Sequence, residues 1–172
     1  MLPNVLSLAR IALTPVLAAL LLSSWEHKDV VAAAVFAVAS LTDTLDGRIA
    51  RARGQVTNFG KFIDPLADKV LVSCALIALV ELDRVSAWVA MVIVVREFAV
   101  TGLRLVASSS EVIAASWLGK GKTIAQMLAI FVLCLDAGSD TFQDVLVGIA
   151  VVLTVLSAAD YFARSWRHLS TA

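Results

Sequence analysis

Residues 43–68 read DTLDGRIARARGQVTNFGKFIDPLAD, a polar stretch between two strongly apolar ones at 30–41 and 70–80. The stretch contains four aspartates, which fall at the ends of segments apolar enough for membrane helices. An ionisable side chain inside such a helix costs about 2.5–3.5 kcal/mol, so it normally faces a cavity, a partner or an ion. These aspartates therefore need one common explanation. They are Asp43, Asp46, Asp64 and Asp68.

The rest of the chain is unusually apolar. Hydrophobic residues make up 60% of the 172 positions, against roughly 45–50% in a soluble domain. A membrane-spanning helix needs about 20 predominantly apolar residues. We therefore predict an all-α integral membrane protein, with residues 1–172 forming a single domain. Its six transmembrane helices are expected at 4–25, 29–51, 61–81, 85–107, 121–138 and 142–163.

Basic residues predict the orientation of these helices. Of the 14 Lys and Arg residues, all except Lys28 and Arg84 fall on one side of the predicted bundle. Short loops rich in Lys and Arg stay in the cytoplasm. We therefore expect both termini and the polar stretch on the cytoplasmic side of a bacterial inner (plasma) membrane. The formal net charge of zero gives no reason to expect a nucleic-acid partner.

The spacing of the aspartates predicts a metal site. Asp43 and Asp46 are three residues apart and Asp64 and Asp68 are four apart, so each pair projects from one face of its helix. Four carboxylates brought together would repel one another unless cations or protons neutralised them. An all-oxygen ligand set suits Mg²⁺, Mn²⁺ or Ca²⁺ better than zinc. Two such ions can stabilise both the attacking and the leaving oxygen of a phosphoryl displacement.

Small and basic residues accompany the aspartates. Gly47 and Ala50 lack bulk beside Asp46, so a ligand or a neighbouring helix can approach the backbone there. Arg51, one helical turn after Gly47, can offer a bidentate fork to a phosphate. Ordinary packing between membrane helices is the structural alternative for the glycine.

Several other residues are predicted to be structural. Gly54, Asn58 and Gly60 predict a turn within the connection 51–60. Cys74 and Cys134 lie in apolar stretches without metal-ligand spacing and are expected to be packing residues. The two histidines, at 27 and 168, are expected on the solvated surface.

Eight positions of the polar stretch together match the signature of a known family. The pattern is D-x-x-D-G-x-x-A-R, eight further residues, and G-x-x-x-D-x-x-x-D, which covers 43–51 and 60–68. In this the chain resembles the CDP-alcohol phosphatidyltransferases. The resemblance implies a six-helix membrane enzyme, usually homodimeric, with a polar cavity that faces the cytoplasm. It also implies a reaction in which the hydroxyl of an acceptor alcohol attacks the lipid-side phosphorus of CDP-diacylglycerol and expels CMP.

The resemblance also implies roles for particular residues. The four aspartates would bind Mg²⁺ or Mn²⁺, with two ions expected, and Asp68 would also be the general base. The residues expected to contact CDP-diacylglycerol are Asp46, Gly47, Ala50, Arg51, Thr57 and Gly60.

A group of basic residues outside the signature points to a phosphorylated acceptor. Arg96 and Arg104 are two helical turns apart and roughly on one side of their helix, so one of them could hold a phosphate together with a lysine. The alternative is that these residues only set the orientation of the helices, as the positive-inside rule describes, or contact lipid head groups. The candidates for the acceptor phosphate are Lys61, Arg96, Arg104, Lys120 and Lys122.

The wider sequence resembles one branch of the family, the bacterial phosphatidylglycerophosphate synthases. Shared features are Thr57 to Phe62, Asp64 to Lys69, Arg96-Glu97 with Gly102 to Arg104, and Trp117 to Lys120 with Lys122-Thr123. This implies sn-glycerol 3-phosphate as the acceptor. Inositol phosphate and phosphatidylglycerol are the alternative acceptors.

The sequence disfavours two other kinds of membrane protein. A cation-coupled transporter would place its carboxylates near the middle of the membrane and usually has an inverted repeat. The acids here gather at one end of their helices, and no repeat is visible. A purely structural membrane partner would have no use for four costly aspartates.

Overall fold

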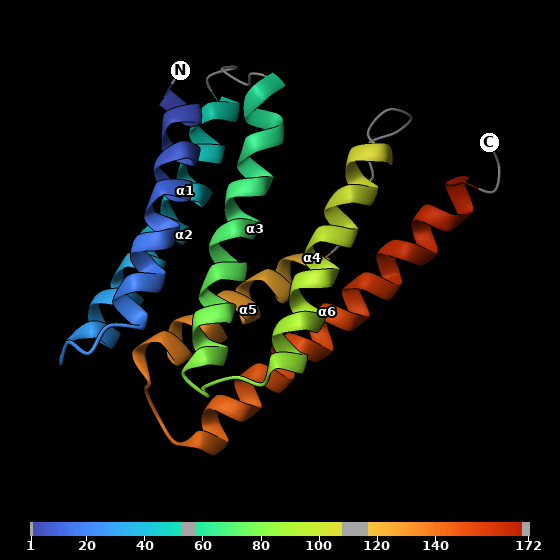
Figure 1. Ribbon diagram of the computed structural model, residues 1–172. Helices are drawn as coiled ribbons and strands as arrows, with labels where there is room; N and C mark the ends of the chain where they lie inside the picture. The colour runs from blue at the N-terminus through green and yellow to red at the C-terminus, as the bar shows by residue number, and fades with distance from the viewer. Residues whose placement is uncertain (1, 53–57, 108–116, 170–172) are drawn as a thin grey trace. The chain divides into compact units, whose positions relative to one another are not determined.

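The computed structural model of the chain describes the backbone of residues 2–52, 58–107 and 117–169. Within these ranges it describes the side chains of residues 7–42, 63–103 and 117–163. All regular secondary structure in the described residues is helical, as the sequence predicts (Figure 1). The helices are α1 (Leu2–Leu21), α2 (Lys28–Ala52), α3 (Asn58–Glu81), α4 (Ala87–Ala107), α5 (Trp117–Leu135) and α6 (Asp140–Leu169).

Most helix boundaries differ from the predicted ones by a few residues; α1, for example, ends at Leu21 and not at residue 25. Asn58 and Gly60 belong to the first turn of α3, so the prediction of a turn at these two residues is wrong. A glycine is tolerated there because the first four amides of a helix have no intrahelical partner in any case. Gly54 lies outside the described residues. Helix α6 continues beyond the predicted end at residue 163 and includes Arg164 to Leu169.

The chain divides into two compact units. Unit 1 comprises Met1–Ala90 and Ile130–Ala137, and unit 2 comprises Met91–Ala129 and Gly138–Ala172. The long helices α4 and α5 each contribute residues to both units.

In unit 1, helix α1 packs against both α2 and α3 (Figure 1). Leu17 and Leu21 of α1 are fully buried, as are Leu71 and Leu79 of α3. Ala75 lies between these two leucines on α3 and is also fully buried. Lipid tails are as apolar as leucine, so membrane helices associate through close packing, which small residues permit. The alanine therefore explains how the two backbones can approach each other.

Helices α3 and α5 end in the same way. Asp83 follows α3 with φ 56°, and Asp136 follows α5 with φ 52°. In each case the aspartate amide donates to the carbonyl three residues earlier, and the next amide donates to the carbonyl five residues earlier. This pair of hydrogen bonds defines a Schellman motif. Glycine usually occupies the position of positive φ, and aspartate is one of the few other residues that tolerates it.

In unit 2, helix α6 begins with a well-formed cap. Ser139 accepts a hydrogen bond from the amide of Phe142 through its Oγ (3.3 Å), as serine commonly does at a helix N-cap. Gly138 precedes it with φ 91°, and a Cβ there would lie 2.8 Å from a ring carbon of Phe142. The turn from α5 into α6 therefore requires glycine for both its backbone angle and its space.

Many large apolar side chains are exposed, among them Leu41, Ile77, Val95 and Val152. Two of the described helical segments, Trp117–Leu135 and Asp140–Ala163, are long and apolar enough to cross a membrane by length and composition. A shorter apolar segment covers Ser7–Leu21. Such surfaces fit a lipid environment better than water.

Candidate active site

The described part of the aspartate cluster lies near the N-terminal end of α3. Asp64 and Asp68 are one helical turn apart and both are half-buried. The Oγ of Ser7 in α1 donates a hydrogen bond to Asp64. The Nζ of Lys69 lies 2.8 Å from an oxygen of Asp68 and pairs with it. The site thus presents two carboxylates on one face of a helix, and one of them has a neutral hydroxyl as its partner.

Polar residues of α1 fix this end of unit 1. Arg10 is buried, and its Nε donates to the carbonyl of Ala39 in α2 at 3.1 Å. Together with the bond from Ser7 to Asp64, this contact holds the N-terminal half of α1 against the middle of α2 and the start of α3. The spacing of Ser7 and Arg10 in an apolar helix was a visible signal, although the sequence does not identify their partners.

The other half of the predicted metal site is described only by its backbone. Asp43 and Asp46 lie in α2, as do the signature residues Gly47, Ala50 and Arg51. Gly60 and Lys61 lie in the first turn of α3. The side chains of all these residues, and Thr57 altogether, lie outside what the structure describes. Among the described residues alone, no group of three or more His, Cys, Asp or Glu could hold a metal ion. The four-aspartate site stays a prediction.

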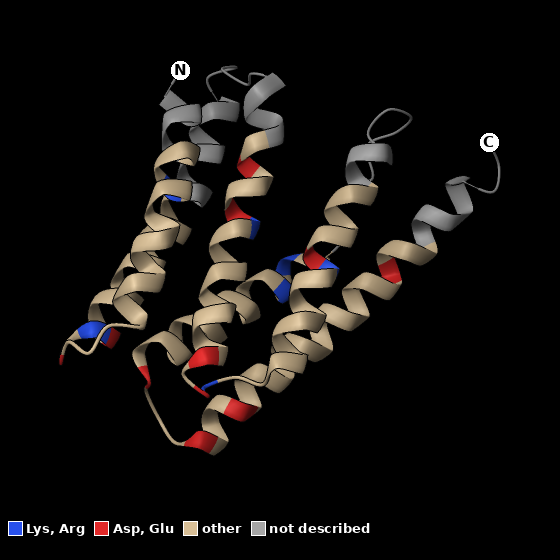
Figure 2. Cartoon of the chain, in the orientation of Figure 1, with Lys and Arg blue, Asp and Glu red and all other residues tan. Residues whose placement is uncertain are grey.

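Two of the five predicted acceptor-site residues come together in unit 2. Lys122 of α5 and Arg96 of α4 both contact the Oε1 atom of Glu97, Arg96 through its Nη1 at 3.1 Å. Lys122 is 2% exposed and Glu97 is 5% exposed. Arg96 also donates through its Nη2 to the Oγ of Ser157 in α6 at 2.8 Å. The charged residues of α4 and α5 can be followed in Figure 2.

The remaining acceptor-site candidates are not part of this cluster as described. Lys120 is exposed, and its Nζ lies 4.6 Å from the ring centroid of Trp117, a cation–π contact on the surface of α5. The side chains of Lys61 and Arg104 lie outside the described residues. Sequence reasoning did not identify Glu97 or Ser157 as partners of the basic residues. A serine within an apolar helix was the only signal for Ser157.

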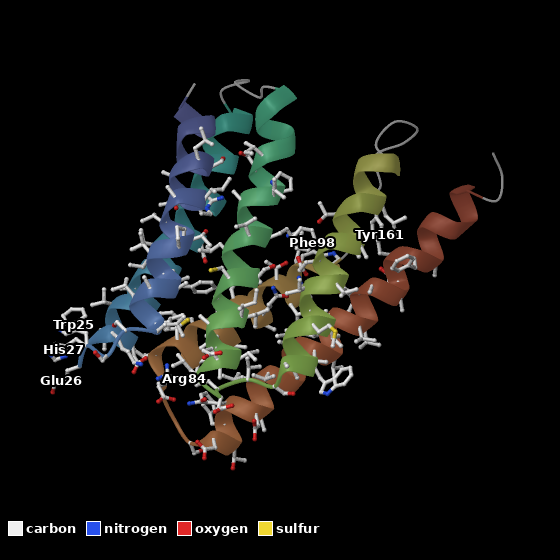
Figure 3. The ribbon with its side chains drawn as sticks, viewed as in Figure 1. Trp25, Glu26, His27, Arg84, Phe98 and Tyr161 are labelled. Atoms are coloured by element: carbon white, nitrogen blue, oxygen red, sulfur yellow. The ribbon has the colours of Figure 1, made fainter. Side chains whose placement is uncertain are left out.

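The cysteines and the described histidine behave as structural residues. Both Cys74 and Cys134 are free thiols; Cys134 is fully buried, as expected of a packing residue, and Cys74 is half-buried. The ring of His27 meets that of Trp25 edge-on, with centroids 5.7 Å apart, in the exposed connection between α1 and α2. Figure 3 shows both at the same end of unit 1 as Arg84. His168 has no described side chain.

The apolar helices, the carboxylates at one end of α3 and the signature across α2 and α3 together indicate a class of membrane enzyme. The chain belongs to the CDP-alcohol phosphatidyltransferase family, whose model matches residues 1–156. It is accordingly a membrane protein built of apolar helices.

Several named proteins are similar to this chain over almost its whole length. It is 47% identical to the CDP-diacylglycerol–glycerol-3-phosphate 3-phosphatidyltransferase of Bacillus subtilis, over 99% of this chain and 98% of that protein. It is 44% identical to a probable phosphatidylglycerophosphate synthase of Mycobacterium tuberculosis, over 98% of this chain and 83% of that protein. A Rickettsia bellii protein with the same name as the Bacillus enzyme is 39% identical over 94% and 93% of the two chains.

Proposed function

We propose that this chain is a CDP-diacylglycerol–glycerol-3-phosphate 3-phosphatidyltransferase, which forms phosphatidylglycerophosphate and CMP for phospholipid biosynthesis. The observation that carries the proposal is the 47% identity over nearly the full length to a Bacillus subtilis protein of that name. The chemistry of the described residues agrees with it, because α3 presents Asp64 and Asp68 on one face within the family signature.

The aspartates supply the metal ligands in this proposal. Asp43, Asp46, Asp64 and Asp68 would hold two Mg²⁺ or Mn²⁺ ions, since carboxylate oxygens are the donors that these ions prefer. Asp64 fits this role because its described partner, Ser7, is an uncharged hydroxyl that does not itself neutralise the carboxylate. When bound, the ions would supply electrostatic stabilisation of the attacking and leaving oxygens.

The chain's own residues bind, orient and deprotonate the substrates. Asp68 accepts the proton of the acceptor hydroxyl as that oxygen bonds to the lipid-side phosphorus, while the bond from this phosphorus to the CMP oxygen breaks. Lys69 fixes the orientation of the Asp68 carboxylate through its ion pair at 2.8 Å. The nucleotide diphosphate would contact Asp46, Gly47, Ala50, Arg51, Thr57 and Gly60.

The phosphate of the acceptor would bind to the basic residues. Arg96 and Lys122 support this assignment because both approach one oxygen of Glu97 and thus lie close to each other. A guanidinium can bind two phosphate oxygens at once, and an ammonium adds a point charge. Lys61, Arg104 and Lys120 complete the proposed set.

The proposal includes a topology. All six helices would cross the membrane as a single domain, with both termini and a polar cavity facing the cytoplasm, and two copies would form a homodimer in the bilayer. The contact between Ser7 and Asp64 supports this arrangement, because it brings the starts of α1 and α3 to the same end of unit 1. The bias of Lys and Arg toward that side supports the orientation.

The direct test measures CMP release. Purified protein in mixed micelles is given CDP-diacylglycerol, Mg²⁺ or Mn²⁺, and separately glycerol 3-phosphate, inositol phosphate, serine or phosphatidylglycerol. We expect CMP and a lipid product only with glycerol 3-phosphate, and no activity after chelation or in Asp68→Asn. Asp144→Asn, which removes an exposed carboxylate from the first turns of α6, is the matched control and should remain active. CMP release with a different acceptor would support the reaction but refute glycerol 3-phosphate as the acceptor. No metal-dependent CMP release with any acceptor would refute the assignment as an enzyme of this class.

A further inference from the structure

Helix α4 connects two other helices through adjacent charged residues. Successive positions in a helix point about 100° apart, so Arg96 and Glu97 face different neighbours. Arg96 reaches Ser157 of α6, and Glu97 reaches Lys122 of α5. The result is a polar path across unit 2 that joins α5, α4 and α6.

Glu97 brings two cations to a single atom. The Nη1 of Arg96 and the Nζ of Lys122 both approach Oε1 of Glu97. Without this carboxylate the two cations would repel each other in a poorly screened environment. Lys122 and Glu97 are almost completely buried, so neither can rely on solvent. The cluster thus holds two cationic side chains around one carboxylate, and two cations placed close together suit an anionic ligand.

Ser157 binds the second terminal nitrogen of the Arg96 guanidinium, the one that does not contact Glu97. Its Oγ accepts from Nη2 of Arg96 at 2.8 Å and donates to the carbonyl of Thr154 at 3.1 Å, so the hydroxyl is fixed in direction. The Nε of Arg96 is buried and has no hydrogen-bond partner in the described part of the chain. A buried donor without a partner is unfavourable, and an incoming phosphate oxygen would supply the missing acceptor.

We propose that Glu97 and Ser157 are positioning residues, which hold Arg96 and Lys122 in the arrangement that binds the phosphate of the acceptor. This inference rests on the proposed function, because it deepens the account of the same acceptor site. Neither residue touches the reacting atoms. Their effect is exerted on the affinity for the phosphorylated acceptor, through the two cations that they orient.

Helix α6 offers a matched pair of variants to test this. Ser157 and Thr154 are both buried hydroxyl residues on α6, but only Ser157 contacts Arg96, and the Oγ1 of Thr154 has no partner among the described residues. Ser157→Ala should raise the KM for glycerol 3-phosphate about fivefold, since one hydrogen bond to a charged group is lost. The kcat and the KM for CDP-diacylglycerol should change less than twofold. Thr154→Val should leave all three constants unchanged.

Glu97 is tested by two further variants. Glu97→Gln keeps the shape of the side chain but removes its charge, and we expect the KM for glycerol 3-phosphate to rise about tenfold or more. Glu97→Asp, which restores the charge, should recover part of the loss. If Glu97→Gln does not fold, the comparison of Ser157→Ala with Thr154→Val decides the question alone.

The outcomes separate the two levels of the proposal. Wild-type protein that releases no CMP with glycerol 3-phosphate refutes the proposed function, and with it this inference. If the wild type is active, a purely structural role for the path would lower the thermal midpoint of Ser157→Ala and leave the KM for glycerol 3-phosphate unchanged, which overturns the inference alone. A rise that affects both substrates equally, or one that Thr154→Val reproduces, also overturns it.

Discussion

The two ends of unit 1 differ in how many described partners surround their charged side chains. At one end the guanidinium of Arg84 meets the carboxylates of Asp29 at 2.7 Å and Asp136 at 3.4 Å. It also donates to the carbonyls of Leu133 and Cys134, at 3.2 and 3.3 Å. Burial lowers the pKa of Arg84, but the hydrogen bond to Asp29 and the two negative charges outweigh burial and raise the pKa above its ordinary value. One cation here has four acceptors.

At the other end the acids have fewer partners among the described side chains. Asp64 accepts a hydrogen bond from the neutral Ser7, and Asp68 pairs with Lys69. The comparison teaches that the two groups of charges serve different purposes. The charge of Arg84 is paired with two carboxylates, and its contacts join the ends of several helices, so its role is to stabilise the fold. Among the described side chains, Asp64 has only the neutral hydroxyl of Ser7 as a partner, an arrangement that leaves its charge available to a cation.

The largest expected effect is on catalysis, from Asp64→Asn. Removing one ligand charge should reduce CMP release at least about 100-fold, the magnitude typical of losing one electrostatic contact to a transition state. Stability should not fall, because the amide oxygen can still accept from Ser7 while repulsion among the aspartates decreases. The measurements are CMP release and the thermal midpoint in detergent. A fall in the midpoint without a loss of turnover would assign Asp64 to the fold and remove the contrast between the two ends.

Arg84→Met should show the opposite pattern. It removes four contacts to a mostly buried guanidinium and deprives Asp29 and the carbonyl of Cys134 of their described partner, while the carbonyl of Leu133 keeps the amide of Asp136. We expect the free energy of unfolding to fall by about 2–4 kcal/mol, with turnover per folded molecule unchanged. The measurement is an unfolding curve in detergent, monitored by circular dichroism. Lys28→Met, which removes a half-buried cation at the start of α2, is the control and should change stability little.

Much of the fold could be predicted from the sequence, because membrane helices leave a long apolar signal. The six helices appear in the expected order, and Asp64 and Asp68 lie one turn apart on α3, as their spacing predicts. The errors fall at helix ends. Asn58 and Gly60 are typical turn residues, yet both fit the first turn of α3, where propensity has little effect.

The partners of the charged residues could not be predicted, since they depend on packing. In the sequence, Arg84 was only an exception to the positive-inside pattern, and the structure gives it a specific role at the ends of α3 and α5. Glu97 was only a neighbour of Arg96, and its contact with Lys122 joins residues 25 positions apart. The sequence shows which charges are costly, whereas the packing decides which of them are neutralised.

The smallest effects should separate the two acids around Arg84. Asp29→Asn removes the closer partner, whose side chain is 26% exposed, from the first turn of α2, where a negative charge also favours the helix. It should cost about 1 kcal/mol of unfolding free energy. Asp136→Asn removes a pair at 3.4 Å whose acid is 52% exposed, and asparagine tolerates the same positive φ. Its effect should stay below about 0.5 kcal/mol. Equal losses in the two variants, measured by the same denaturation assay, would mean that Arg84 acts through the charge of the whole loop cluster and not chiefly through Asp29.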